Sequence, residues 1–171
     1  MGWQPGVSQK LSLPQPLSAE HQVDGFSCGE PALDQWLQRR ALSNQMTGAS
    51  RTFVVTNETN QVIAYYAVAA GAVSHQEATG RIRRNMPDPV PVMVLARLAV
   101  DQQYQGHQLG AAMLQDTVRR VLAIAQNAGV RALLVHALNE RARQFYIYYG
   151  FEPSPANPLT LMLQLHATNA H

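Results

Sequence analysis

The sequence contains one cysteine, Cys28, and no long hydrophobic run. A single cysteine cannot form an internal disulfide, which is typical of a reducing compartment. No apolar stretch approaches the ~18 residues that a membrane-spanning helix needs. The first ten residues, MGWQPGVSQK, lack the charged start and the apolar run of a secretory signal. We therefore expect a cytoplasmic protein that does not associate with a membrane.

Metal-binding motifs are also missing from the sequence. No two histidines have a ligand spacing such as H-x-x-x-H, and the six are scattered along the chain at His21, His75, His107, His136, His166 and His171. We therefore predict no metal site. Cys28 lies at an expected helix start, where a thiolate would be stabilised. We nevertheless interpret it as a small buried residue.

Lysine is nearly absent, since 12 of the 13 basic residues are arginine and only Lys10 is lysine. The net charge is +2. Arginine forms bidentate contacts with phosphate and stacks on bases, which lysine does less well. Three arginines, Arg81, Arg83 and Arg84, form a tight cluster. The composition indicates either a phosphate-binding surface or a GC-rich genome that favours arginine codons.

The chain is 171 residues long, 46% hydrophobic and 14% charged, which suits one globular domain with a substantial core. No repeat or linker divides it. We expect a single domain over residues 1–171, with residues 1–10 as a flexible tail.

The apolar pattern predicts α/β architecture with a mixed sheet. A capping box at Ser27–Glu30 begins a helix that ends near Gly48, with Leu33, Trp36, Leu37 and Ala41 facing inward. In the helix predicted at 107–127, Asp116 faces outward. The other predicted elements are an edge strand at 11–17, a hairpin of strands at 51–56 and 61–73, strands at 92–100, 131–136 and 159–165, and helices at 107–127 and 139–149.

The segment 94–110, VLARLAVDQQYQGHQLG, is an apolar strand followed by a Gln/Gly-rich turn and a helix. Such a turn presents backbone N–H groups and a helix dipole to a pyrophosphate. Residues 105–110 resemble the Q/R-x-x-G-x-G/A pattern of the GNAT acetyltransferases, although Gln108 stands where the pattern has its first glycine. Gln108 fits if its φ stays negative. The alternative is a plain strand-to-helix turn without a ligand.

A second segment, NERARQFYIYYGF at 139–151, resembles the last motif of the same family, N-x-x-A-x-x-F-Y-x-x-x-G-F. The resemblance implies that Tyr146 is the general acid that protonates the departing thiolate of coenzyme A, although a phenol that only packs on the cofactor is the alternative. Asn139 either contacts the cofactor arm or caps the helix. Phe145 is more typical of a core residue than of a contact.

The two motifs together imply a GNAT fold, with a central mixed, mostly antiparallel twisted sheet of about six strands flanked by helices. They also imply acetyl-CoA as co-substrate. The implied cofactor-binding residues are Leu98, Ala99, Val100, Gln105, Gly106, His107, Gln108, Leu109, Gly110, Ala111, Asn139 and Phe145. In the family, the backbone of the 98–100 strand pairs with the pantetheine arm.

No carboxylate stands out as a general base, because Glu58, Glu77, Asp88 and Asp101 are scattered among turns. A lysine amine has a pKa of about 10.4, whereas an α-amino group has a pKa of about 7.7–8.0, and less once its carboxyl is esterified. An α-amine is therefore largely neutral at cell pH. A site with an acid and no evident base favours an aminoacyl ester as acceptor.

Long segments, including GRIRRNMPDPVPVMVLARLAVD and VHALNERARQFYIYYGFEPSP, resemble the acetyltransferase toxins of type II toxin–antitoxin modules. The resemblance runs from about Leu17 to Leu165. It implies acetylation of the α-amino group of aminoacyl-tRNA, which blocks translation. It also implies a homodimer, and a ribbon-helix-helix antitoxin through which the complex contacts DNA and represses its own operon. The tRNA-binding candidates are Arg39, Arg40, Arg51, Arg81, Arg83, Arg84 and Arg97; for Arg97 a salt bridge or a cofactor contact is an equal alternative.

Two other functions remain open at this point. An N-acetyltransferase for a small amine or a protein N-terminus would use Tyr146 in the same way but would not need the arginines. A binding module that keeps the fold without catalysis would act with its antitoxin as a DNA-bound regulator. Gln108 is the residue that favours this last alternative.

Overall fold

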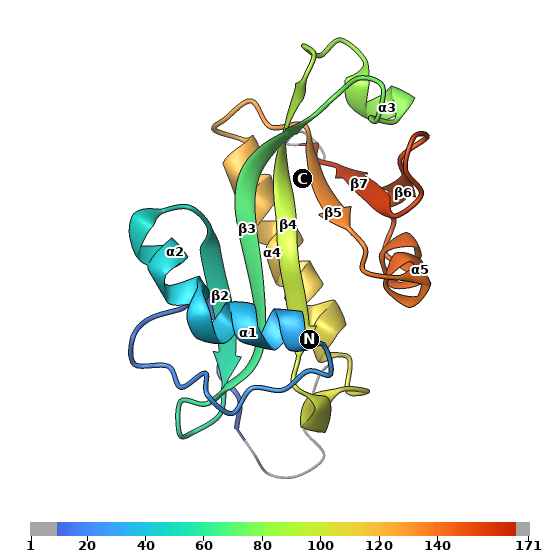
Figure 1. The fold of residues 1–171 in the computed structure, drawn as a ribbon. Coiled ribbons are helices and arrows are strands. Elements are labelled where there is room, and N and C mark those ends of the chain that lie inside the picture. Colours follow the sequence, from blue (N-terminus) through green and yellow to red (C-terminus); the bar gives the residue numbers. More distant parts are fainter. Residues whose placement is uncertain (1–9, 167–171) are drawn as a thin grey trace. The chain divides into compact units, whose positions relative to one another are not determined.

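The computed structural model describes residues 10–166, so most of the expected tail at 1–10 lies outside the described residues. Seven strands form a sheet in the order β1-β2-β3-β4-β5-β7-β6 (Figure 1). The described chain divides into two compact units, residues 10–69 with 97–117 and residues 70–96 with 118–166. Each unit is built around its own part of the sheet.

The first unit begins with the strands of the predicted hairpin. β2 (Arg51–Thr56) and β3 (Val62–Val73) pair antiparallel, with Arg51 opposite Val68. The two-residue strand β1 (Gln15–Pro16) pairs with β2 at the edge of the sheet. A proline cannot donate a ladder hydrogen bond, which explains why this strand is short and peripheral.

The helix expected from 31 to about 48 is two helices, α1 (Pro31–Arg39) and α2 (Ala41–Thr47). The break lies at Arg40, whose φ of −124° departs from helical geometry. The predicted capping box is wrong, since Glu30 is the N-cap and its side chain makes no capping hydrogen bond. Pro31 occupies the first turn, where its missing N–H costs nothing.

The inward face predicted for these helices is confirmed. Leu37 and Ala41 are buried, and Leu33 and Trp36 pack against the same cluster. The cluster's buried members are Leu17, Phe26, Leu37, Ala41, Val54, Val62, Tyr65 and Ala99. The core of the first unit therefore lies between α1 and α2 and the strands that they cover.

β4 (Val90–Val100) leads through a short 3₁₀ turn, η1 (Gln102–Tyr104), into α4 (Leu109–Ala125). The predicted outward orientation of Asp116 is wrong, because Asp116 is only 4% exposed and accepts a 2.6 Å hydrogen bond from the Tyr66 hydroxyl of β3. Asp116 follows Leu109 and Met113 at helical spacing, so it shares their buried stripe.

The second unit contains the parallel pair of the sheet. β5 (Ala132–His136) runs parallel to β4, with Val92 opposite Ala132, and antiparallel to β7 (Thr160–Gln164). β6 (Glu152–Pro153), which the sequence analysis missed, pairs with β7. The helices α3 (Gly80–Arg83) and α5 (Glu140–Tyr148) belong to this unit. The prediction of a mixed, mostly antiparallel sheet is confirmed.

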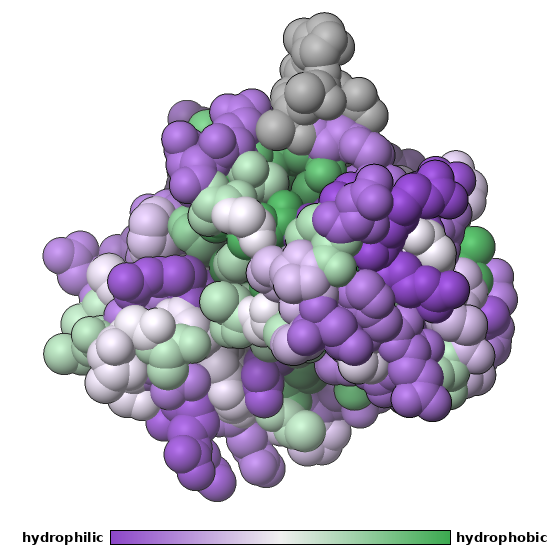
Figure 2. All heavy atoms as spheres, turned by 90° about the horizontal axis from the view of Figure 1, so that it is seen from above, coloured by the Kyte–Doolittle hydropathy of each residue, from purple (hydrophilic) through white to green (hydrophobic). Residues whose placement is uncertain are grey.

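The surface is mostly hydrophilic, with small apolar areas among polar side chains in the view of Figure 2. No helix within residues 10–166 is long and apolar enough to cross a membrane. The large apolar side chains that are most exposed are Leu13, Met46, Leu138 and Tyr148.

Candidate acetyl-CoA site

The turn that follows β4 is fixed by Asp101. Its backbone N–H donates to the carbonyl of Ile63 at 2.8 Å. Its two carboxylate oxygens accept from the backbone N–H groups of Ser27 (3.1 Å) and Gln103 (3.0 Å). Asp101 therefore ties the end of β4 to the segment before α1 and caps η1.

Gln105 closes the same turn from the other side. Its side-chain Nε2 donates to the carbonyl of Val100 at 2.8 Å and to the carbonyl of Cys28 at 2.9 Å. The sequence motif assigned Gln105 to the cofactor. In the structure the Gln105 carboxamide braces the turn. Gln105 would therefore affect ligand binding by fixing the backbone conformation of the turn.

Two residues of the turn have left-handed backbone conformations. Gly106 has a φ of +85° and Gln108 has a φ of +64°. The expectation of a negative φ at Gln108 is therefore wrong. The carbonyl of Gln108 accepts the first helical bond, from the N–H of Ala112 at 3.1 Å. The chain needs a left-handed residue here to enter α4, which explains why the family pattern has glycine at this position.

The first turn of α4 supplies main-chain donors. The N–H groups of Leu109, Gly110 and Ala111 have no helical acceptor, because the carbonyls four residues earlier lie outside the helix. Free N–H groups and the positive end of the helix dipole suit a diphosphate. His107 is exposed beside them. The turn fits the pyrophosphate of acetyl-CoA.

At the end of β4, Leu98 and Val100 are partly exposed, whereas Ala99 is only 6% exposed and belongs to the core cluster with Phe26 and Tyr65. Ala99 therefore contributes backbone groups and packing.

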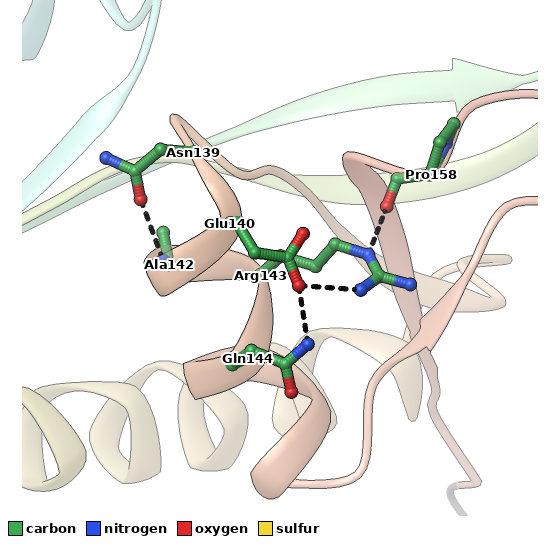
Figure 3. Close-up of polar contacts among 6 residues, drawn as sticks. All are labelled: Asn139, Glu140, Ala142, Arg143, Gln144 and Pro158. Atoms are coloured by element: carbon green, nitrogen blue, oxygen red, sulfur yellow. Dashed lines mark hydrogen bonds and ion pairs between the residues drawn. The ribbon is translucent and has the colours of Figure 1, made fainter.

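Asn139 begins α5 as its N-cap. Its side-chain oxygen accepts from the N–H of Ala142 at 2.9 Å (Figure 3). Of the two roles expected for Asn139, the structure shows the cap. The next residue, Glu140, accepts from Gln144 at 2.6 Å and from Arg143 at 3.1 Å, and Arg143 also donates to the carbonyl of Pro158 at 2.9 Å. These contacts hold α5 against the segment before β7.

Tyr146 lies on the buried face of α5, with 6% of its surface exposed. Its ring packs edge-on against Phe145 and Phe151, with centroid distances of 5.2 and 5.3 Å. Burial raises the pKa of the Tyr146 hydroxyl well above its usual value. The phenol is therefore protonated at neutral pH and is able to donate a proton. Phe145 also packs on Tyr149, at 5.2 Å, as expected for a packing residue.

In the second unit, three candidate arginines lie in α3 or directly after it. Arg81, Arg83 and Arg84 are exposed. Arg83 donates to the carbonyls of His75 (3.1 Å) and Ala78 (3.3 Å), which fixes its side chain near the loop before the helix. Arg81 and Arg84 are the more available of the three for a ligand.

In the first unit, Arg39 and Arg40 are exposed at the junction of α1 and α2. Arg51 donates to the carbonyl of Gln45 at 2.7 Å. The guanidinium of Arg97 lies over the ring of Trp36, 4.3 Å from its centroid. Trp36 was expected only as a core residue, because a ring contact between distant segments leaves no local signal in the sequence.

A pocket of about 520 Å³ lies beside η1. Its walls include Asp24, Asp101, Gln102 and Tyr104. Two carboxylates in the wall make it unsuited to phosphate groups. No group of three or more His, Cys, Asp or Glu residues within 10–166 is placed to hold a metal ion.

The strand, turn and helix described above form a candidate site for a nucleotide cofactor, and comparison with known proteins identifies the family. Residues 48–153 match the acetyltransferase (GNAT) domain family. The chain belongs to this family, and it has the family's fold.

A relative from Mycobacterium tuberculosis, the "tRNA-acetylating toxin", is 48% identical over 159 residues, which cover 93% of this chain and 95% of the relative. Among solved structures, AtaT complexed with acetyl-methionyl-tRNAfMet superposes with a TM-score of 0.84 at 25% identity, covering 91% of this chain and 95% of AtaT. A mutant AtaT toxin bound to the C-terminus of the antitoxin AtaR and to acetyl-CoA gives 0.78 at 26% identity, with coverages of 93% and 94%.

Proposed function

We propose that this protein is a toxin that transfers acetyl from acetyl-CoA to the α-amino group of aminoacyl-tRNA and thereby blocks translation. The observation that carries the proposal is the 48% identity to a tRNA-acetylating toxin across nearly the whole of both chains. The protein is an acetyl-CoA-dependent N-acetyltransferase, with acetyl-CoA as co-substrate.

The turn between β4 and α4 binds the cofactor in this proposal. The diphosphate lies against the N–H groups of residues 109–111, and the pantetheine arm runs along the backbone of Leu98–Val100. Main-chain N–H groups of the same strand stabilise the oxyanion of the tetrahedral intermediate. Gln105 and Asp101 act indirectly, because their hydrogen bonds hold the turn in its binding conformation.

Tyr146 is the general acid. As the new C–N bond forms and the C–S bond breaks, the phenol gives its proton to the sulfur. The excess proton of the nitrogen leaves to solvent, and solvent returns one proton to the Tyr146 phenolate. Because burial raises the pKa of Tyr146, the phenol keeps its proton near pH 8, where the acceptor amine is largely neutral.

The arginines bind the polyanionic acceptor stem. Arg39, Arg40, Arg51 and Arg97 belong to one unit, and Arg81, Arg83 and Arg84 to the other. Contacts of this kind supply affinity that falls with salt.

The proposal extends to partners and location. The protein forms a homodimer, acts in the cytoplasm and is neutralised by a ribbon-helix-helix antitoxin. The complex binds DNA through the antitoxin and represses its own operon. Sedimentation of the purified toxin tests the dimer, and a DNA-binding assay of toxin, antitoxin and both together tests the repression complex.

The function is tested by incubating the protein with radiolabelled acetyl-CoA and total bacterial tRNA, either aminoacylated or deacylated. Label that enters only the charged pool, and leaves with the amino acid after mild base, is the expected result. Absence of label from both pools, despite binding of acetyl-CoA, would contradict the proposal and favour a small amine or a protein N-terminus as acceptor.

A further inference from the structure

Arg97 has an unusual environment for a half-buried cation. Its guanidinium carbon lies 4.3 Å from the centroid of the Trp36 ring, which is a cation–π contact. Within residues 10–166, no carboxylate pairs with Arg97, and its guanidinium donates no hydrogen bond to another protein group. The N–H groups at the edge of the guanidinium are therefore available to a ligand, while the flat face of the guanidinium lies on the Trp36 ring.

The Trp36 ring is itself held by a second aromatic ring. Its ring stacks on Tyr65, with centroids 6.0 Å apart and an interplanar angle of 12°. Tyr65 is fully buried, donates its hydroxyl hydrogen to the carbonyl of Leu33 at 2.7 Å and packs edge-on against Phe26. A rigid aromatic stack beneath the guanidinium lowers the entropy lost when Arg97 binds an anion.

The position of Arg97 on β4 indicates which anion it meets. Arg97 directly precedes Leu98–Val100, the strand proposed for the cofactor arm, and it comes well before the turn proposed for the diphosphate. Arg97 and Ala99 point to the same side of the strand, and Ala99 packs in the cluster that α1 covers. Arg97 therefore lies toward the acetyl end of the arm, where the acceptor amine has to arrive.

We propose that Arg97, held on Trp36, binds the phosphodiester that precedes the esterified 3′-terminal nucleoside of the aminoacyl-tRNA. This inference rests on the proposed function. A planar guanidinium with free in-plane donors matches two phosphate oxygens, and the contact is charge-assisted. Trp36 is a positioning residue, since it acts on the substrate only through Arg97.

The test uses two small acceptors that carry the amino acid identified in the tRNA assay. One is the aminoacyl ester of adenosine, which has no phosphate, and the other is the aminoacyl ester of cytidylyl-adenosine, which has one phosphodiester. The wild-type protein is expected to acetylate the dinucleotide ester with a higher kcat/KM. Arg97→Gln is expected to lower this value about 10- to 100-fold and to lower the value for the adenosine ester much less.

Further variants separate the guanidinium from simple charge. Arg97→Lys keeps the charge but loses the planar fork, so it should recover only part of the loss. Trp36→Leu should raise KM for the dinucleotide ester with little change in kcat, and Trp36→Phe, which keeps an aromatic face, should restore the KM. Arg141→Gln is the matched control, because Arg141 is exposed and has no protein partner within residues 10–166.

The outcomes distinguish the two proposals. Equal loss by Arg97→Gln on both esters, or no loss on either, would overturn the phosphate contact while charged tRNA is still acetylated. If charged tRNA is acetylated but neither ester is, the second measurement is inhibition of tRNA acetylation by uncharged cytidylyl-adenosine. This inhibition should be weaker in Arg97→Gln than in the wild type. Unchanged inhibition would refute the phosphate contact. Failure of the wild-type protein on charged tRNA would refute the proposed function itself.

Discussion

Gln108 is predicted to destabilise the fold, so that Gln108→Gly gives a more stable protein. A non-glycine residue in the left-handed region costs about 1–2 kcal/mol, and Gln108 has a φ of +64°. Glycine in a fixed conformation loses about 0.5–1 kcal/mol more backbone entropy. The net gain should be roughly 0.5–1 kcal/mol, or about 1–4 °C in Tm for a chain of this size.

Urea and thermal unfolding measure the gain, and the structure offers matched controls. Asn60 and Asn85 also have positive φ, at 64° and 60°, but asparagine tolerates this region, so Asn60→Gly and Asn85→Gly should gain less. Gly106→Ala should lose about 1–2 kcal/mol. A Cβ at Gly106 meets no atom within 4 Å, so this loss would come from the backbone alone.

Acetyl-CoA binding, followed by calorimetry, completes the test. The affinity of Gln108→Gly should be kept, because the proposed donors are main-chain N–H groups. A Gln108→Gly protein that is no more stable than the wild type would refute the strain argument. A loss of affinity in that variant would show that the Gln108 side chain itself contacts the ligand.

Tyr146→Phe should keep the fold and the acetyl-CoA affinity but lower kcat about 10²- to 10⁴-fold. The control variant Tyr148→Phe should be active. Near-normal turnover of Tyr146→Phe would eliminate the general-acid role. The acetylation rate should rise with pH as the acceptor amine, with a pKa of about 7.7–8.0 or lower, loses its proton. Because the pKa of Tyr146 is raised, the rate should show no decline up to about pH 10, and a decline near pH 8 would point to a different acid. Cys28 is half-buried rather than buried as expected; this partial burial, with hydrogen bonding to Asp34, raises the pKa of its thiol to about 12, so iodoacetamide at pH 8 should alkylate it more slowly than a free thiol, and ordinary alkylation would contradict the raised pKa. Replacing Arg81, Arg83 and Arg84 with glutamine should reduce the salt dependence of tRNA binding by about one unit of slope for each phosphate that the variant no longer neutralises, and an unchanged slope would place the tRNA elsewhere.

Local patterns predicted most of the elements. β2 has its predicted bounds, α4 is two residues shorter than predicted at each end, and β5 begins one residue later than predicted. Prediction failed at a break within one helix and at a very short strand. The predicted long helix breaks at Arg40, and β6, only two residues long, exists because it pairs with β7.

The candidate site shows the same division. Sequence motifs identified the turn and Tyr146, and the structure shows how Gln105 and Asn139 act, the first as a brace and the second as a cap. The motif did not predict the left-handed conformation of Gln108, because glutamine is rarely found there. The roles of these residues in binding and catalysis stay predictions until the variants are measured.

The sequence by itself determined the order of the elements, the family and the chemical groups available for acetyl transfer, because helix periodicity, strand alternation and short motifs are properties of neighbouring residues. Only the tertiary structure decided which distant groups meet. The contact of Arg97 with Trp36 and the buried hydrogen bond of Tyr66 with Asp116 join segments far apart in the chain. Such contacts depend on how the strands and helices pack, and no local pattern encodes them.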